Sequence, residues 1–171
     1  MDYIFHYQSP LGPITMQSDG ESLTGLLFDD EKYFGKTIHT DQKDAIQCDK
    51  PDLPAFAETV KWLDVYFSGE EPDFLPPIAL HTTPFRREVC EIMLTIPYGE
   101  TMSYGEIAAL IAQRRGIDRM SAQAVGGAVG HNPISIIIPC HRVIGTDGSL
   151  TGYAGGLNKK AALLKLENAA L

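Results

Sequence analysis

The most informative stretch of this chain is residues 134–143, which read ISIIIPCHRV. Isoleucine is β-branched and favours extended structure, so residues 134–138 predict a buried β-strand that ends at Pro139. Cys140 and His141 follow directly. Neighbouring side chains in an extended segment point to opposite faces, so a water molecule or a bend in the chain would be needed to connect the thiol with the imidazole.

A cysteine beside a histidine points to nucleophilic chemistry, with a buried structural cysteine as the alternative. The thiolate is the nucleophile, and an ordinary thiol with a pKa of about 8.5 stays mostly protonated at neutral pH unless a base or cation lies nearby. Asn132-Pro133 is a turn signal, and the Asn132 amide could hold the loop in place. Downstream, glycines surround Tyr153, a composition that suits an aromatic ring stacking on a flat base.

Two short helices with a break between them are expected upstream. Ser103 and Glu106 match a capping box, which starts the first helix. Ser121 is suited to be the N-cap of the second, the small-residue run 122–129. The pair resembles a helix-turn-helix unit, and two ordinary core helices are the alternative. Glycine costs about 1 kcal/mol in a helix interior, so Gly126-Gly127 suggests that a backbone or a ligand approaches this helix closely.

The first half of the chain has the patterns of a sheet and one helix. Short β-prone runs predict strands, and apolar residues at three- and four-residue spacing predict a helix. The strands are expected at residues 3–7, 14–17 and 23–28, and the helix at residues 52–68. The acidic, proline-rich stretch 70–77 has the composition of a linker, which places a domain boundary at about residue 80.

The composition is that of a globular protein. The 171 residues are 44% hydrophobic and 21% charged, with no apolar run near the roughly 20 residues of a membrane span. The amino terminus lacks the features of a signal peptide. The chain has three cysteines, Cys48, Cys90 and Cys140, and no two of them form a CxxC motif. This argues against both a disulfide framework and a zinc cluster. We therefore expect a soluble, cytoplasmic protein with reduced thiols and no membrane association.

The charge is unevenly distributed. The formal net charge is −8, which by itself argues against a nucleic-acid partner. Residues 1–80 hold 5 Lys/Arg and 15 Asp/Glu, whereas residues 81–171 hold 9 and 7. This asymmetry keeps open the possibility that the second half faces a polyanion.

Residues 138–143, IPCHRV, resemble the signature of the O6-alkylguanine-DNA alkyltransferases, also called methylated-DNA–protein-cysteine methyltransferases. The resemblance continues in register from about residue 84 to 168, through residues 96–101, 103–108, 124–128, 130–133 and 153–157. The first 80 residues match only in length and general character. The resemblance implies an α/β (α+β) fold. A ribonuclease-H-like sheet domain would span residues 1–80, and a mostly helical domain with a winged-helix-like helix-turn-helix would span residues 81–171.

The same resemblance implies direct reversal of DNA damage. The alkyl group of O6-alkylguanine, and less often of O4-alkylthymine, would move onto Cys140. His141 would act as the base through a water molecule and be oriented by Glu167, as a carboxylate orients histidine in hydrolytic triads. Asn132 would hold the turns of the site, and Tyr104 would rotate the nucleotide and donate a proton to the leaving guanine. The thioether product has no route back, so the protein would act once, without a cofactor.

The partner implied is double-stranded DNA that contains O6-alkylguanine, read from the minor groove by a monomer with a flipped base. The groove is narrow, so small residues on the helix after Ser121 make sense. The residues expected to contact DNA or the flipped base are Gln123, Ala124, Gly126, Arg142, Val143, Tyr153, Ala154 and Gly155. The preferred size of the alkyl group stays open.

The chain departs from the family pattern at two points. Many members carry an arginine that fills the gap left by the flipped base, whereas this chain has Gln123, so we expect weaker or more salt-sensitive DNA binding. Some relatives bind zinc near the amino terminus, but Cys48, His6 and His39 lack convincing spacing, and we predict no metal.

Three other functions remain as alternatives. A relative that recognises alkylated guanine without repairing it would lack the acceptor cysteine, which is present here. A Cys/His acyl-transfer or protease-type enzyme would have no use for a helix-turn-helix. A sequence-specific transcription factor is disfavoured by the near-neutral second half.

Overall fold

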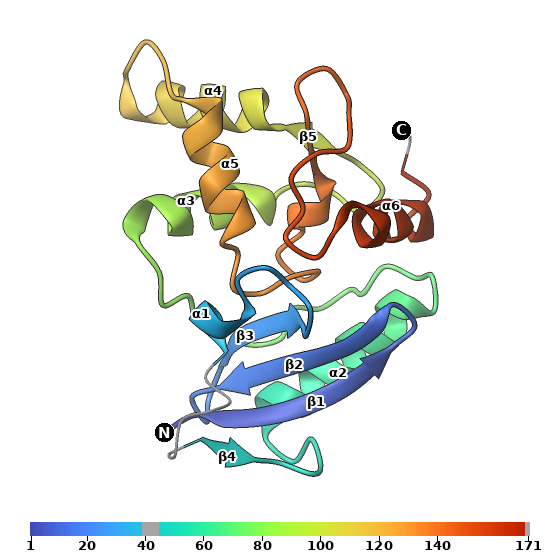
Figure 1. Ribbon diagram of the computed structural model, residues 1–171. Helices are drawn as coiled ribbons and strands as arrows, with labels where there is room; N and C mark the ends of the chain where they lie inside the picture. Colours follow the sequence, from blue (N-terminus) through green and yellow to red (C-terminus); the bar gives the residue numbers. More distant parts are fainter. Residues whose placement is uncertain (39–44, 170–171) are drawn as a thin grey trace. The chain divides into compact units, whose positions relative to one another are not determined.

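The computed structural model describes residues 1–38 and 45–169. They form two compact units, Met1–His81 and Thr82–Leu171 (Figure 1). The predicted mixed fold is confirmed, because the first unit contains a sheet and the second is mostly helical. None of the helices in the described ranges is long and apolar enough to cross a membrane.

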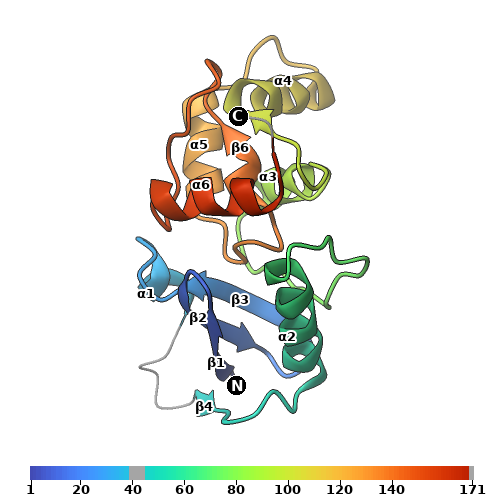
Figure 2. The same cartoon turned by 90° about the vertical axis from the view of Figure 1, so that its right-hand side faces the viewer.

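The first unit is built on a four-stranded sheet with the strand order β3-β2-β1-β4. The strands are β1 (Tyr3–Ser9), β2 (Gly12–Ser18), β3 (Leu23–Phe28) and β4 (Ile46–Gln47). The first three are antiparallel neighbours, and β4 pairs in parallel with β1. The helices are α1 (Phe34–Thr37) and α2 (Pro54–Phe67), and α2 lies along one face of the sheet (Figure 2). The three predicted strands and the predicted helix are thus confirmed.

Apolar side chains on both faces stabilise this sheet. Phe5 of β1 meets Phe56 of α2 with ring centroids 5.9 Å apart. Its neighbour Ile4 points to the opposite face and packs in a buried cluster with Leu27 and Ile38. Because both faces are covered, the central strand β2 is buried over most of its length.

The second unit is mostly helical. Its helices are α3 (Pro84–Met93), α4 (Tyr104–Arg115), α5 (Ala122–Gly130) and α6 (Leu157–Leu166). A single 3₁₀ turn, η1 (Cys140–Arg142), leads into β6 (Val143–Ile144), which pairs in parallel with β5 (Met102–Ser103). Helix α5 packs against both α3 and α4 (Figure 1).

The predicted helix-turn-helix is present in α4 and α5. The Ser103 hydroxyl accepts a hydrogen bond from the Glu106 amide at 3.0 Å and caps the start of α4. Gly116 ends that helix in the left-handed conformation, with φ +64°. The Ser121 hydroxyl accepts from the Ala124 amide at 3.2 Å and caps α5. The helix limits therefore follow from local capping chemistry that the sequence contains.

The predicted strand at residues 134–138 is wrong. This segment is buried, but it forms a series of turns instead of a strand. The Ile137 amide donates to the Ser135 carbonyl at 2.8 Å, and Ile136 between them has φ +70°. A β-branched residue rarely adopts this conformation, which costs about 1–3 kcal/mol. The isoleucines are therefore buried by the packing of a tight loop and not by a sheet.

Candidate active site

Cys140 is the first residue of η1 and is buried, with 5% of its surface exposed. Pro139 before it has φ −81° and ψ 66°, and the Cys140 amide donates to the Ile138 carbonyl at 2.8 Å. These are the features of an inverse γ-turn. The chain thus bends sharply into a 3₁₀ turn, so the expectation that Cys140 and His141 point to opposite faces of a strand does not hold.

The loop that leads to the cysteine is pinned by Asn132. Its Nδ2 donates to the Ile138 carbonyl at 2.8 Å, and its Oδ1 accepts from the Ile134 amide at 3.1 Å. Asn132 is itself buried. One amide side chain therefore spans the turns and fixes the carbonyl that also begins the γ-turn at the cysteine.

His141 pairs with Glu167, which lies at the end of α6. His141 Nε2 and Glu167 Oε2 are 2.5 Å apart, and both side chains are fully buried. The other ring nitrogen, Nδ1, is the atom that a relay to Cys140 would use. The family resemblance implies this pairing, and the structure brings the two side chains together across 26 residues of chain.

The electrostatics of this pair favour a neutral histidine beside an ionised carboxylate. Burial lowers the pKa of His141, and the charges of Arg142 and Lys160 lower it further against the opposing effect of Glu167. Burial alone would raise the pKa of Glu167, but hydrogen bonds and charges at His141 and Arg142 outweigh it and lower that pKa to about 2. The positive charge of Arg142 compensates the carboxylate, so the imidazole can stay neutral and act as a base.

Arg142 was expected to contact DNA, but the structure buries its side chain. Its side chain is only 10% exposed. Its Nε donates to Oε1 of Glu167 at 2.8 Å, and its Nη1 donates to the Ile96 carbonyl at 2.7 Å. The guanidinium is therefore directed into the second unit and engaged by the carboxylate of the candidate site.

Tyr104 is brought to the site by the pairing of β5 with β6. Ser103 lies opposite Ile144, so the first residue of α4 starts beside the segment that follows Cys140. The Tyr104 hydroxyl lies 3.1 Å from the Thr151 carbonyl, to which it donates. Burial raises the pKa of Tyr104, and the neighbouring Cys140 raises it further, so the phenol stays protonated.

Lys160 is a further candidate site residue, which the sequence motifs did not indicate. It is completely buried in α6, and its Nζ donates to the carbonyls of Val143 at 2.5 Å and Thr151 at 2.7 Å. Burial lowers its pKa to about 8, while the charge at Cys140 acts in the opposite direction. The signal was present in the helical spacing, because positions 160, 163 and 164 share one helical face with Glu167.

Of the residues expected on the recognition helix, Gln123 and Ala124 are exposed and Gly126 is half-buried. Gly127 also faces solvent, whereas Val125 is buried. A methyl group on Gly127 would meet no atom of the protein within 4 Å, and one on Gly126 would make ordinary contact with the Tyr104 ring at 3.9 Å. Internal packing therefore does not require this glycine pair.

The glycine-rich loop lies between β6 and α6. Tyr153 is buried, with 8% of its surface exposed, and Ala154 and Gly155 are half-buried. The loop carbonyl of Thr151 is held from two sides, by the Tyr104 hydroxyl and by Lys160. The segment expected to line a base pocket is thus tied to the same residues that surround Cys140.

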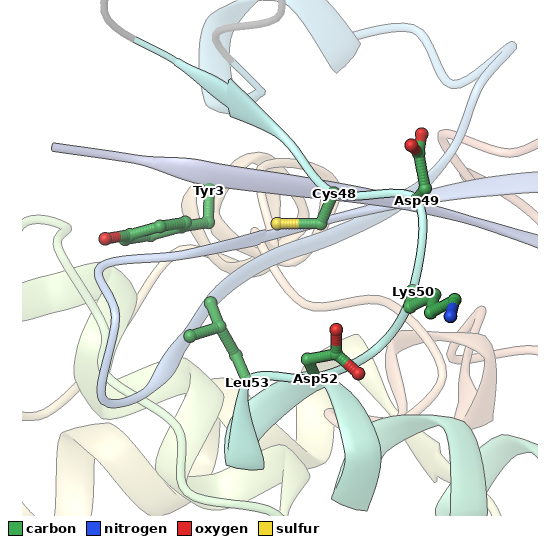
Figure 3. Close-up of a pocket in the computed structure, with 6 residues that line it drawn as sticks. All are labelled: Tyr3, Cys48, Asp49, Lys50, Asp52 and Leu53. Atoms are coloured by element: carbon green, nitrogen blue, oxygen red, sulfur yellow. The ribbon is translucent and has the colours of Figure 1, made fainter.

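The other two cysteines lie in less reactive settings. Cys90 is buried in α3, and burial, followed by the charges at Cys140 and Glu91, raises its pKa to about 12. Cys48 lines a cavity of about 450 Å³ in the first unit, together with Tyr3, Asp49, Lys50, Asp52 and Leu53 (Figure 3). Burial and the two aspartates raise the Cys48 pKa. Among the described residues, no cluster of three His, Cys, Asp or Glu side chains could hold a metal ion.

Comparison with known families identifies both units. Residues 84–169 match the model described as "6-O-methylguanine DNA methyltransferase, DNA binding domain", and residues 3–80 match the "ribonuclease-like domain" of the same name. The chain belongs to the 6-O-methylguanine DNA methyltransferase family. The resemblance found from residue 84 onward is confirmed, and membership extends to the first 80 residues, where the motifs alone had shown little.

Relatives cover nearly the whole chain. The methylated-DNA–protein-cysteine methyltransferase of Mycobacterium tuberculosis is 46% identical over 167 residues, which are 96% of this chain and 93% of the relative. That of Haemophilus influenzae is 40% identical over 166 residues, 96% of this chain and 86% of the relative.

Solved structures of the family are also similar. The crystal structure of Mycobacterium tuberculosis OGT in complex with DNA matches with a TM-score of 0.79 and 43% identity, covering 97% of this chain and 92% of the other. The Methanococcus jannaschii O6-methylguanine DNA methyltransferase matches with a TM-score of 0.63 and 29% identity, over 97% and 94% of the two chains.

Proposed function

We propose that this family member repairs double-stranded DNA by moving the alkyl group of O6-alkylguanine, and less readily of O4-alkylthymine, onto its own Cys140. The observation that carries the proposal is the buried pairing of His141 with Glu167 directly beside Cys140. This arrangement lies in the same unit as an exposed, small-residue α5. A nucleophile and an oriented base in the same unit as a helix suited to the minor groove fit alkyl transfer from DNA.

The chemistry proceeds by one displacement. Neutral His141 accepts the thiol proton of Cys140 through a water molecule, and the thiolate attacks the alkyl carbon. The sulfur–carbon bond forms as the carbon–oxygen bond breaks, and the electron pair of the broken bond stays on the guanine oxygen. Tyr104 donates a proton to the leaving guanine. The product is a thioether, so each molecule reacts once.

Ionised Glu167 stabilises the imidazolium that forms. Its low pKa and the hydrogen bond to Nε2 keep the carboxylate charged when His141 takes up the proton. Asn132 supports the reaction indirectly, since its two hydrogen bonds hold the turn that ends at the cysteine.

DNA binding is assigned to α5 and the glycine-rich loop. Small residues of α5, among them the exposed Ala124 and the half-buried Gly126, would allow the helix to enter the minor groove. Gln123 would hydrogen-bond the base that the flipped nucleotide leaves unpaired, without the charge of an arginine. Tyr153, Ala154, Gly155 and the backbone of Val143 would line the pocket for the flipped guanine. Base flipping costs a few kcal/mol, so Gln123 bears on the rate.

The two halves of the chain have different parts in the proposed function. Residues 1–80 carry the acidic charge and serve as a scaffold that does not bind DNA, whereas residues 81–171 carry the site. The protein acts as a cytoplasmic monomer, and the reaction needs no organic cofactor or metal.

The test is the intact mass of the protein after incubation with a duplex that contains one O6-methylguanine. One added methyl group should map to Cys140, and Cys140→Ala should gain none. Cys90→Ala is the matched control, since it removes a second buried thiol of the same unit and should leave the gain unchanged.

Two outcomes would contradict the proposal. An unchanged mass with preferential binding to the lesion duplex would favour a protein that recognises alkylated guanine and recruits other factors. Neither transfer nor preference would reject DNA repair altogether, and thiol esters would then be tested as substrates.

A further inference from the structure

Arg142 is a buried arginine directly beside the proposed acceptor and base. Its side chain is 10% exposed, while that of Glu167 next to it is fully buried. Arginine keeps its positive charge in proteins, so the charge needs permanent partners when it is buried. The proposed alkyl transfer does not by itself assign this residue a part.

Three contacts hold the Arg142 guanidinium. Nε donates to Oε1 of Glu167 at 2.8 Å, and Nη1 donates to the Ile96 carbonyl at 2.7 Å. The guanidinium carbon lies 5.7 Å from the centroid of the Tyr98 ring, within the range of a cation–π interaction. Ile96 and Tyr98 belong to the turn that follows α3, so Arg142 connects η1 to a segment far away in the sequence.

The same turn also holds the carboxylate. The Gly99 amide donates to Oε1 of Glu167 at 3.1 Å, alongside Arg142. The other oxygen, Oε2, faces Nε2 of His141. One carboxylate oxygen is therefore anchored to the turn, and the second is left in a fixed orientation toward the imidazole.

We propose that Arg142 is a positioning residue of the alkyl-transfer site, which clamps Glu167 against the turn at residues 96–99 and keeps His141 neutral and ready to accept a proton. This inference rests on the proposed function, because it assigns a part in that reaction. Arg142 acts through Glu167 and His141, and is not itself expected to touch the guanine or the DNA.

The charges around His141 explain why a cation matters here. Glu167 at the end of α6 favours the imidazolium, whereas Lys160 of α6 and Arg142 of η1 oppose it, and Cys140 is the group that supplies the proton. Without the charge of Arg142, only Lys160 would oppose the carboxylate of Glu167, and His141 would bind a proton more tightly before the reaction. A protonated histidine cannot take the thiol proton, so removal of the Arg142 charge would slow transfer at low and neutral pH.

Arginine is suited to this position for a geometric reason. Its planar fork can donate in two fixed directions, here to a carboxylate and to a backbone carbonyl. A lysine would keep the charge but not this two-point contact. A glutamine would keep donor hydrogens but not the charge. The two substitutions therefore separate the two contributions of Arg142.

The experiment measures transfer of methyl from a lesion duplex by full-length wild type, Arg142→Gln and Arg142→Lys, in single turnover at saturating DNA from pH 5.5 to 9. For Arg142→Gln we expect the acid limb of the rate profile to move up by about one pH unit. On that limb this shift is about a tenfold slower rate, with recovery toward wild type at high pH. Arg142→Lys should move the limb less.

A second measurement follows the titration of the His141 ring by NMR in the DNA-free protein. The pH of half-protonation should rise in the order wild type, Arg142→Lys, Arg142→Gln. This measurement does not depend on transfer, so it separates failure of the inference from failure of the proposed function. Should Arg142→Gln lack a cooperative thermal transition, wild type and Arg142→Lys alone carry the comparison.

Lys165→Met is the control. Lys165 is an exposed cation of α6 that lies two residues before Glu167, and its removal should leave both the acid limb and the His141 titration in place. The inference is overturned if the folded Arg142 variants lose the same factor in rate at every pH, or if His141 titrates at the wild-type pH in them.

Discussion

The N-terminal sheet and the loop that leads to Cys140 are both buried and rich in β-branched residues, yet their conformations are determined differently. In β1 to β3, each strand is satisfied by regular pairing with its neighbour. Residues 134–138 have an equally strong β-prone composition, but they form turns that are held by Asn132. Burial and residue type therefore indicate that a segment lies inside the protein, whereas hydrogen-bond partners decide its conformation.

The difference also concerns what each region does. The sheet can lose one side-chain contact and keep the backbone hydrogen bonds between its strands. The site depends on single side chains, Glu167 and Lys160 among them, that come from a helix at the far end of the chain. Four changes would break or sharpen this comparison.

The largest effect is expected for Glu167→Gln. An amide in place of the carboxylate cannot stabilise the imidazolium of His141, and general-base catalysis contributes about 10²–10⁴-fold. We expect methyl transfer to a lesion duplex to slow by about 100-fold or more in single-turnover assays. A rate within a few-fold of wild type, in a folded variant, would remove Glu167 from the mechanism.

Asn132→Ala should destabilise the protein by about 2–3 kcal/mol. The change removes two hydrogen bonds and leaves the buried Ile138 carbonyl and Ile134 amide without these partners. Ile14→Val in β2 is the comparison, since it removes one buried methylene for about 1 kcal/mol. Chemical denaturation measures both, and an equal loss of stability would mean that the loop is no more dependent on single residues than the sheet.

Lys160→Met should loosen the glycine-rich loop. The ammonium joins the Val143 and Thr151 carbonyls, and a hydrogen bond to a charged group contributes about 1.5–3 kcal/mol. Amide hydrogen exchange at Gly145 and Gly148 should become about tenfold faster or more, with slower methyl transfer. Lys165→Met, on the exposed side of α6, should change neither, and slow exchange in the Lys160 variant would show that the loop is held by other contacts.

The smallest effect is expected for Gly127→Ala. This helical position has open space around it, so alanine should stabilise α5 by about 0.5–1 kcal/mol. If α5 enters the minor groove, the added methyl group should at the same time weaken binding to the lesion duplex. Thermal unfolding and a binding titration are the two measurements. A variant that is more stable and binds equally well would place the groove contact elsewhere on the helix.

Much of the fold could be predicted because it is encoded locally. The spacing of apolar residues in α2 and the serines that cap α4 and α5 act within one or two turns of helix. The helix-turn-helix and the first three strands therefore agree with the sequence. The conformation of residues 134–138 could not be predicted this way, because the turn at Ile136 is imposed by Asn132 and by surrounding packing against its own preference.

The sequence by itself determined the family, through motifs in register along the chain, and the capped helices, and it marked Cys140 and His141 as the proposed reactive pair. The tertiary structure decided the places of Arg142 and Lys160. From the sequence, Arg142 was expected to contact DNA and Lys160 had no expected role, but both are buried and donate to backbone carbonyls around the site. The physical reason is that a cationic side chain has the same composition on a surface or in a core. Only the burial and the partners that folding supplies decide which it becomes.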